Sequence, residues 1–320
     1  MSQQTVKHIL ITGAAGFVGS NLVPYLQAHL PGVHITRVAR KRTSGELAVI
    51  LWEELSEASF QDIDAVIHLA GKAHDTKNTS AAREYFDVNF ELTKKIYDLF
   101  LGSSAQKFIY MSSVKATADQ VKGVLDEEHD SDPQTPYGKS KLQAENYIIQ
   151  ESQQSKDKSQ DYYILRPCMI HGPGNKGNLN LLYQFVNKSL PYPLAAFQNR
   201  RSFLSIDNLS FVVQQLLTEK VPSGVYNLAD DESLATNELI RIIAKIQNRS
   251  PRLWNISKGM IKAVSKIGDV LRLPLNSERL QKLTESYEVS NAKIKKALQI
   301  QRMPVDAKEG IEKTLKSFSR

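Results

Sequence analysis

Residues 8–19 read HILITGAAGFVG, an apolar run that passes directly into glycines at positions 13, 16 and 19. The β-branched run His8–Thr12 predicts a buried strand, and the apolar spacing between Phe17 and Leu26 predicts a helix after the glycines. Glycine suits such a turn because the backbone must bend sharply and approach a bound pyrophosphate closely. Amide groups at the start of the helix can then bind phosphate oxygens. The stretch therefore predicts a dinucleotide-binding turn.

The rest of the chain alternates strand and helix signals. Further strands are expected at residues 33–39, 65–70, 107–111, 162–165 and 224–229, with helices between them such as 85–101 and one beginning near Pro136. Such alternation predicts βαβ units, and so an α/β fold with a Rossmann-type, doubly wound parallel sheet covered by helices on both faces. The polar stretch 151–161 is expected to be a loop.

The chain is expected to divide into two structural parts. Residues 1–170 should form the dinucleotide-binding domain, to which a later strand near 224–229 returns. Residues 171–320 should form a smaller, mainly helical lobe that binds the substrate, with helices such as 236–247 and 257–273, whose apolar spacing suits a cap over the crevice.

Composition narrows the class of protein. The 320 residues are 41% apolar and 23% charged, which suits a soluble globular protein and excludes a disordered chain. The single cysteine, Cys168, cannot form an internal disulfide, and no apolar run is long enough for a membrane helix. No signal peptide is recognised, so we expect a cytoplasmic location. The net charge of +7 suits an anionic partner, but scattered basic residues do not favour nucleic acid.

A catalytic constellation is carried by the stretch YGKSK, residues 137–141. If a helix begins near Pro136, Tyr137 and Lys141 lie one turn apart on the same face. A neighbouring ammonium is expected to lower the tyrosine pKa from about 10, so that the phenol can exchange a proton with a carbonyl or alcohol. The predicted strand 107–111 ends in Ser112 and Ser113, where a hydroxyl would point into the ligand crevice.

The GxxGxxG spacing, a serine and then a Tyr-xxx-Lys pair resemble the extended branch of the short-chain dehydrogenase/reductase superfamily, the NAD-dependent epimerase/dehydratase enzymes of nucleotide sugars. The resemblance implies that Ser113 hydrogen-bonds the substrate oxygen and that Tyr137 is the acid/base. It implies that Lys141 holds the nicotinamide ribose and tunes Tyr137. The family also suggests a homodimer, formed through the 85–101 helix and the helix that carries Tyr137.

The resemblance runs over nearly the whole chain and assigns further contacts. Implied cofactor contacts are Gly13, Gly16, Phe17, Val18, Gly19, Ala70, Lys72, Tyr137, Lys141 and Pro167. Implied contacts with a UDP-sugar substrate are Ser113, Lys115, Asn178 and Arg201, the last clamping the diphosphate. No metal site is assigned.

The residues after the second strand bear on the choice of cofactor. Arg40, Lys41 and Arg42 stand there, with no acid before Glu46. A carboxylate would repel a 2′-phosphate, whereas a guanidinium binds it in a bidentate way. The sequence therefore favours NADP(H) contacted by Arg40, with NAD as the alternative.

The sequence leaves more than one type of reaction open. Residues 112–115, 172–178 and 199–202 resemble bacterial 4-keto-reductases that make UDP-N-acetylquinovosamine. That resemblance implies reduction of the C4 keto group of a UDP-4-keto-6-deoxy-hexosamine in surface-polysaccharide synthesis. A UDP-hexose 4-epimerase, acting on UDP-glucose or UDP-GlcNAc, would use the same triad and is the alternative. Val114 and Lys115 argue against a dehydratase, which typically has acids there, and a non-catalytic NADP-binding sensor is the remote alternative.

Overall fold

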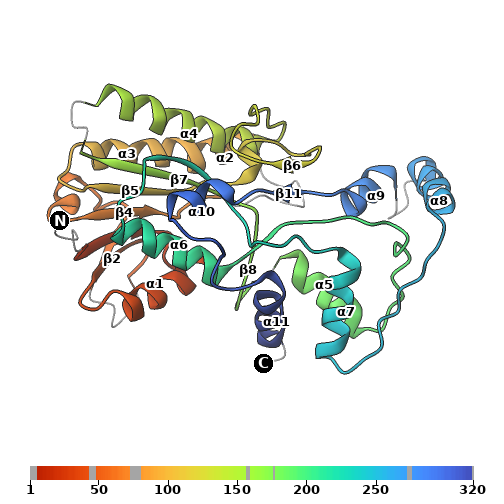
Figure 1. Cartoon of the computed structure of the whole chain (residues 1–320). Helices are drawn as coiled ribbons and strands as arrows, with labels where there is room; N and C mark the ends of the chain where they lie inside the picture. Colours follow the sequence, from red (N-terminus) through yellow and green to blue (C-terminus); the bar gives the residue numbers. More distant parts are fainter. Residues whose placement is uncertain are drawn as a thin grey trace.

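A parallel sheet built around β1 (His8–Thr12) is the centre of this computed structural model, which describes residues 6–42, 48–72, 81–155, 159–175, 177–271 and 276–318 (Figure 1). The seven strands lie in the order β10-β7-β5-β4-β1-β2-β3. The others are β2 (His34–Ala39), β3 (Val49–Leu51), β4 (Ala65–His68), β5 (Lys107–Met111), β7 (Asp161–Pro167) and β10 (Gly224–Leu228). This α/β architecture confirms the expected fold class.

The direction of winding changes beside β1. The strand pairs in parallel with β2 on one side, with Ile9 opposite Ile35, and with β4 on the other, with Ile9 opposite Ala65. Both faces of β1 and β4 are covered, which explains why these strands are continuous apolar runs instead of alternating ones. A change of winding opens a crevice at the carboxyl ends of the strands, and the glycine turn lies there.

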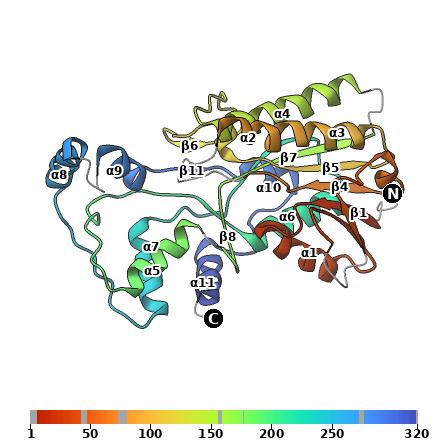
Figure 2. The ribbon, with the colours of Figure 1, turned by 180° about the vertical axis from the view of Figure 1, so that it is seen from behind.

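Helices cover both faces of the sheet (Figures 1 and 2). One face packs against α1 (Phe17–His29) and α6 (Ile206–Thr218), and the other against α3 (Leu92–Leu101) and α4 (Pro136–Gln154). Each face has its own apolar core. The sheet and its four helices thus hold the crevice end of β1, β4 and β5 rigidly.

Two helical predictions need correction. The expected helix 85–101 is divided into α2 (Ala82–Phe86), a π-turn (Asp87–Glu91) and α3. The expected polar loop 151–161 begins too early, because α4 continues to Gln154 and the strand β7 begins at Asp161. Glutamate and glutamine are good helix formers, so an exposed polar end does not stop a helix that already packs on the sheet.

The remaining elements lie outside the seven-stranded sheet. Two small parallel pairs are β6 (Val124–Leu125) with β11 (Glu288–Val289), and β8 (Met169–His171) with β9 (Phe203–Ser205). The helices are α5 (Asn178–Asn187), α7 (Thr236–Ile246), α8 (Lys258–Leu271), α9 (Ser277–Thr284), α10 (Ala292–Ala297) and α11 (Ala307–Ser317), with 3₁₀ turns at Glu57–Phe60 and Val114–Ala116. Within the described ranges no helix is long and apolar enough to cross a membrane.

Candidate active site

The glycine turn after β1 is held by backbone contacts. Gly13 has a φ of 72°, and a Cβ there would lie 2.6 Å from the amide nitrogen of Ala70. A Cβ on Gly19 would lie 2.5 Å from the carbonyl oxygen of Ala14. Neither position accepts a side chain, because the atoms in the way belong to the backbone.

The first turn of α1 is suited to an anion. Gly16 is its N-cap and offers no side-chain cap, and the first turn contains no acid. Gly16, Phe17 and Val18 line a cleft, so the start of α1 and the positive end of its dipole face that cleft, although the Gly16 N–H donates to the carbonyl of Gly13 at 3.0 Å. The pyrophosphate of a dinucleotide fits this end of the cleft.

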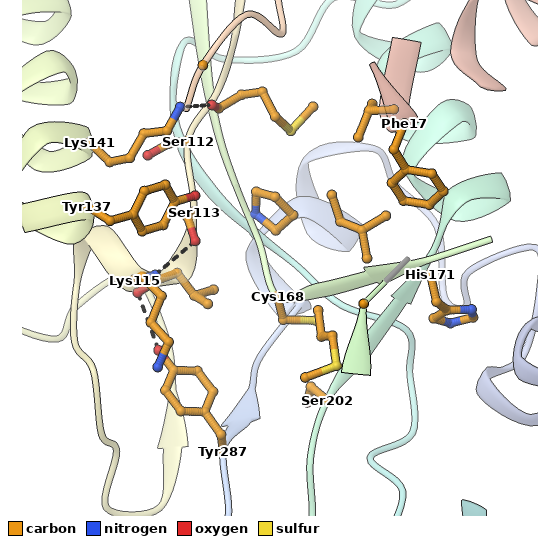
Figure 3. A pocket seen from close by; sticks show the side chains of 18 of the residues that line it. Phe17, Ser112, Ser113, Lys115, Tyr137, Lys141, Cys168, His171, Ser202 and Tyr287 are labelled. Atoms are coloured by element: carbon orange, nitrogen blue, oxygen red, sulfur yellow. Dashed lines mark hydrogen bonds between the residues drawn. The ribbon is translucent and has the colours of Figure 1, made fainter. Parts of the chain in front are cut away.

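The cleft has a volume of about 1610 Å³ and runs from the glycine turn past β5 and β7 to α9. Figure 3 shows some of the side chains that line it. Of the predicted site residues, those that line it are Gly16, Phe17, Val18, Lys72, Ser113, Lys115, Tyr137, Lys141, Pro167 and Arg201. Gly13, Gly19 and Ala70 shape the turn beside it. Arg40 is exposed beyond the end of β2. Asn178 begins α5, but its side chain lies outside the described part of the structure.

The first turn of α4 carries Tyr137 to the cleft. Thr135 caps the helix by accepting a hydrogen bond from the amide of Gly138 at 3.2 Å, and Pro136 occupies the first turn. A Cβ on Gly138 would collide with the carbonyl oxygen of Lys115. Glycine therefore lets α4 lie directly against the turn that follows Ser113. The side chains of Tyr137 and Ser113 point toward each other (Figure 3), and they are hydrogen-bonded.

Burial controls the acidity of the phenol. Desolvation raises the pKa of Tyr137, and its hydrogen bond with Ser113 opposes that rise. The expectation that Lys141 lowers the Tyr137 pKa is wrong in this structure. Lys141 Nζ donates instead to the carbonyl oxygen of Met111 at 2.8 Å and lies 4.8 Å from the centre of the Tyr110 ring. Burial lowers the pKa of Lys141 to about 8, although Glu145 acts in the opposite sense.

A buried ion pair lies behind the serines. Arg166 of β7 binds both carboxylate oxygens of Glu145 through Nε at 3.0 Å, and its Nη2 binds one of them at 2.5 Å. Ser112 also donates to Glu145. The two charged side chains are only 8% and 1% exposed, so β5, α4 and β7 are tied together away from water. Sequence reasoning missed Glu145, although it lies one helical turn after Lys141 on the same face of α4.

A chain of hydrogen bonds holds the loop after β4. His68 bonds Thr12 through Nδ1 at 2.6 Å and Thr93 through Nε2 at 2.9 Å. Thr93 donates to the carbonyl of Asn89, so its oxygen must accept from Nε2–H. Thr12 then donates to Nδ1 while accepting from the amide of Ala70 at 3.2 Å. Complete burial lowers the His68 pKa to about 3, so the ring is neutral and every link has a donor and an acceptor.

The π-turn supplies the next link. The Asn89 amide accepts from Lys72 N–H at 2.8 Å and donates to the Ser140 hydroxyl of α4 at 3.1 Å. A Cβ on Gly71 would lie 3.0 Å from the Asn89 oxygen and 3.2 Å from Lys141 Nζ. The loop that borders the cofactor end of the cleft is thus joined to the helix that carries Tyr137.

Lys115 and Arg201 are held at the other end of the cleft, which Lys282 also lines. Lys115 Nζ donates to the carbonyl of Asp119 at 2.7 Å and lies 4.3 Å from the Tyr287 ring centre. Arg201 donates through Nη2 to the carbonyl of Lys282 and through Nε to that of Glu285 at 3.4 Å. Burial lowers the pKa of both cations. Asp119 and Glu285 line this end of the cleft as well, so both cations have an acid close by.

Known proteins are similar to this chain in sequence and in fold. A family model described as the NAD dependent epimerase/dehydratase family matches residues 9–229. The UDP-glucose 4-epimerase of Vibrio cholerae is 28% identical over 325 residues, covering 98% of this chain and 95% of that protein. The N-acetyl-alpha-D-glucosaminyl-diphospho-ditrans,octacis-undecaprenol 4-epimerase of Escherichia coli O157:H7 is 27% identical, covering 76% and 73%. The structure of UDP-N-acetylglucosamine 4-epimerase from Bacillus cereus matches with a TM-score of 0.77 at 21% identity, over 98% of this chain and 100% of that one.

Proposed function

The chain belongs to the NAD dependent epimerase/dehydratase family, and from that premise we propose that it is a 4-epimerase of a UDP-hexose. The observation that carries the proposal is the hydrogen-bonded pair Ser113 and Tyr137 on the wall of the cleft, between the glycine turn and Arg201. The likeness to the Vibrio cholerae enzyme over nearly the full length of both chains supports it. Ser113, Tyr137 and Lys141 are the proposed catalytic residues.

The residues present fit a dinucleotide. The amides of Phe17 and Val18 would hold its pyrophosphate, because no acid or side-chain cap competes for the start of α1, whereas the Gly16 N–H donates to the carbonyl of Gly13 at 3.0 Å. Tyr137 and Lys141 would border the nicotinamide ribose. A bound nicotinamide would supply the hydride acceptor and donor needed at C4 of the sugar.

The proton transfer would be carried out by residues of this chain. Ser113 would hold the sugar O4 by a hydrogen bond, and Tyr137 Oη would take the proton from O4 and later give it back. Lys141 keeps its ammonium against the carbonyl of Met111, close to the loop at Gly71. An epimerase that returns the proton ends each turnover with that proton on the sugar O4 and Tyr137 deprotonated again, so no outside base is consumed.

The substrate diphosphate would bind at the end of the cleft that Arg201 and Lys115 line. Arg201 is a fixed guanidinium that lines the cleft, and Lys115 is held by Tyr287 and the carbonyl of Asp119. A guanidinium and an ammonium together match the charge of a UDP diphosphate and its attached sugar. We assign Arg201 to the diphosphate and Lys115 to the sugar or the adjacent phosphate.

A second candidate is reduction of a UDP-4-keto-6-deoxy-hexosamine by NADPH. Two observations favour it. The raised pKa of Tyr137 keeps the phenol protonated at neutral pH, and a proton donor is what a C4 carbonyl needs on reduction. Arg40 stands exposed at the end of β2, where a 2′-phosphate would meet a guanidinium.

Two assays separate the candidates. The purified protein should interconvert UDP-glucose and UDP-galactose, or the corresponding N-acetyl sugars, without added cofactor, and Tyr137→Phe should not. If the protein instead consumes NADPH only when given a UDP-4-keto-6-deoxy-hexosamine, the reductase replaces the epimerase. No turnover in either assay, with a dinucleotide still bound, would overturn both and leave the non-catalytic sensor.

We also propose a homodimer joined through α3 and α4. The two helices lie side by side on one face of the sheet, and Tyr147 of α4 donates to Asp98 of α3 at 2.5 Å (Figure 1). Light scattering should give twice the mass of one chain, and a monomer mass at micromolar concentration would refute the pairing.

A further inference from the structure

The helix α8 presents an apolar stripe to solvent. Met260, Val264, Ile267 and Leu271 are 60%, 44%, 55% and 63% exposed. Their spacing of four, three and four residues puts them on one side of the helix. The neighbouring side is buried through Ile261 and Ser265. A continuous exposed stripe of this kind marks a surface that another apolar body covers, whereas single exposed residues need no explanation.

The charged side chains of α8 lie away from the apolar stripe. Lys258, Lys262 and Lys266 occupy the polar side, and Asp269 is the acid described there. Asp269 is engaged by Ser277, whose amide and hydroxyl both donate to it. Long lysine side chains on the polar side can extend toward an anionic surface while the apolar side enters it.

The stripe lies beside the substrate end of the cleft. The helix α8 packs on α9, and both lie at the end of the molecule farthest from the sheet (Figures 1 and 2). Lys282 of α9 lines the cleft, and its carbonyl accepts a hydrogen bond from Arg201. Leu283, the next residue of α9, is 49% exposed. The apolar surface is therefore joined through one short helix to the proposed diphosphate site.

We propose that the stripe 260–271 docks on the surface of an anionic lipid bilayer. The apolar side chains would enter the acyl boundary and the lysines would meet lipid phosphates. A second copy of the chain is the less suitable occupant, because it would cover the apolar side and leave the lysines of the polar side without an anionic partner. Resting on the proposed function, docking would hold the UDP-sugar end of the cleft beside the membrane surface.

Sedimentation with vesicles of phosphatidylethanolamine and phosphatidylglycerol tests the docking. The wild-type protein should sediment with the vesicles, and Ile267→Glu should lower the partition coefficient by about tenfold, as expected for loss of one buried aliphatic side chain. The matched control is Leu181→Glu, which places the same charge on α5 at a leucine that is 68% exposed. Leu181→Glu should sediment as the wild type does.

Folding and activity are followed separately from binding. Because Ile267 is more than half exposed, Ile267→Glu should keep the circular dichroism spectrum and thermal midpoint of the wild type. Met260→Glu provides a second variant should the first not fold. Turnover of a UDP-sugar in free solution should be unchanged, since these side chains do not line the cleft, so a failed docking proposal leaves the proposed function standing.

Several outcomes would overturn the docking. The wild type could remain in the supernatant, Leu181→Glu could lose as much binding as Ile267→Glu, or both α8 variants could bind as well as the wild type. A change in oligomeric mass on Ile267→Glu, with no vesicle binding by the wild type, would assign the stripe to self-association instead.

Discussion

Replacement of Lys141 by methionine tests separately what this lysine contributes to folding stability and what it contributes to catalysis. The side chain is 5% exposed, and its ammonium has one carbonyl partner, on Met111, together with the Tyr110 ring. Methionine keeps an unbranched side chain of similar length and removes the charge. We expect Lys141→Met to lose turnover while relieving the cost of a buried cation.

The direction in which stability changes with pH follows from the pKa values of Lys141 in the unfolded and folded protein. In the unfolded chain Lys141 titrates at its ordinary value of 10.5, and in the folded protein at about 8. The folded form therefore holds the proton less tightly, and folding is penalised in full below pH 8, by about 3 kcal/mol. The penalty shrinks as pH rises from 8 toward 10.5, because the native lysine becomes neutral first. Wild-type stability should thus contain a component that increases with pH, and the variant should lack it.

The pH-dependent part can be isolated from the rest. The unpaired Met111 carbonyl costs the variant about 1–3 kcal/mol, but this cost does not depend on pH. The stability of the variant relative to the wild type should therefore fall by about 2 kcal/mol between pH 7 and pH 9.5. Urea denaturation of both proteins across that range measures the difference, in which all other titrating groups cancel.

Two results would refute the reasoning. A stability difference that is constant over the pH range, or that moves in favour of the variant as pH rises, would mean that the native lysine is not depressed in pKa. Turnover by Lys141→Met near the wild-type rate would remove Lys141 from the proposed catalytic set, whatever its effect on stability.

Four further substitutions test other parts of the site. Tyr137→Phe should reduce kcat by about a thousandfold while dinucleotide affinity, measured by calorimetry, stays unchanged, because only the proton-carrying hydroxyl is lost; near-normal kcat would sink the mechanism. Gly138→Ala should lower both kcat and stability, the latter by about 1–3 kcal/mol, since the new methyl meets the Lys115 carbonyl and lies 2.7 Å from Pro133 Cβ. A variant as active as the wild type would show that α4 can move without harm. Arg201→Ala should raise KM for the UDP-sugar about tenfold with little change in kcat, and the reverse pattern would argue against a diphosphate contact. Arg40→Asp should lower the affinity for NADPH more than the affinity for NADH in fluorescence titrations. Equal effects on both would show that Arg40 does not contact the 2′-phosphate.

The parts of the fold that sequence predicted well are those encoded locally. The glycine turn, the strand before it and the helix after it occupy residues 8–29, and each depends on residues only a few positions apart. All six expected strands lie in the seven-stranded sheet, because buried parallel strands are apolar throughout and stand out from polar turns. The short strand β3 and the pair β8 and β9 were not predicted, since three residues carry too little pattern to recognise.

The electrostatics of the site escaped prediction because burial is a property of distant contacts. Proximity of Tyr137 to Lys141 along α4 suggested an acidic phenol, whereas packing against the sheet made desolvation the dominant influence on its pKa. Arg166 and Glu145 are 21 residues apart, and His68 is bound to threonines 56 and 25 residues away. No local pattern reports such partners, although the chemistry of each pair is simple once the fold has brought it together.

The Tyr-xxx-Lys pattern therefore states a packing requirement as well as a chemical one. Tyr137 meets Ser113 only because α4 approaches the turn carrying Ser113 and Lys115 at van der Waals range, and that approach depends on the missing side chain of Gly138. The same helix then places Lys141 against β5 and Glu145 against Arg166. A sequence that kept the tyrosine and lysine but filled position 138 would retain the recognisable residues and lose their juxtaposition. The glycine has no part in the chemistry, yet the position of the phenol relative to the serine depends on it.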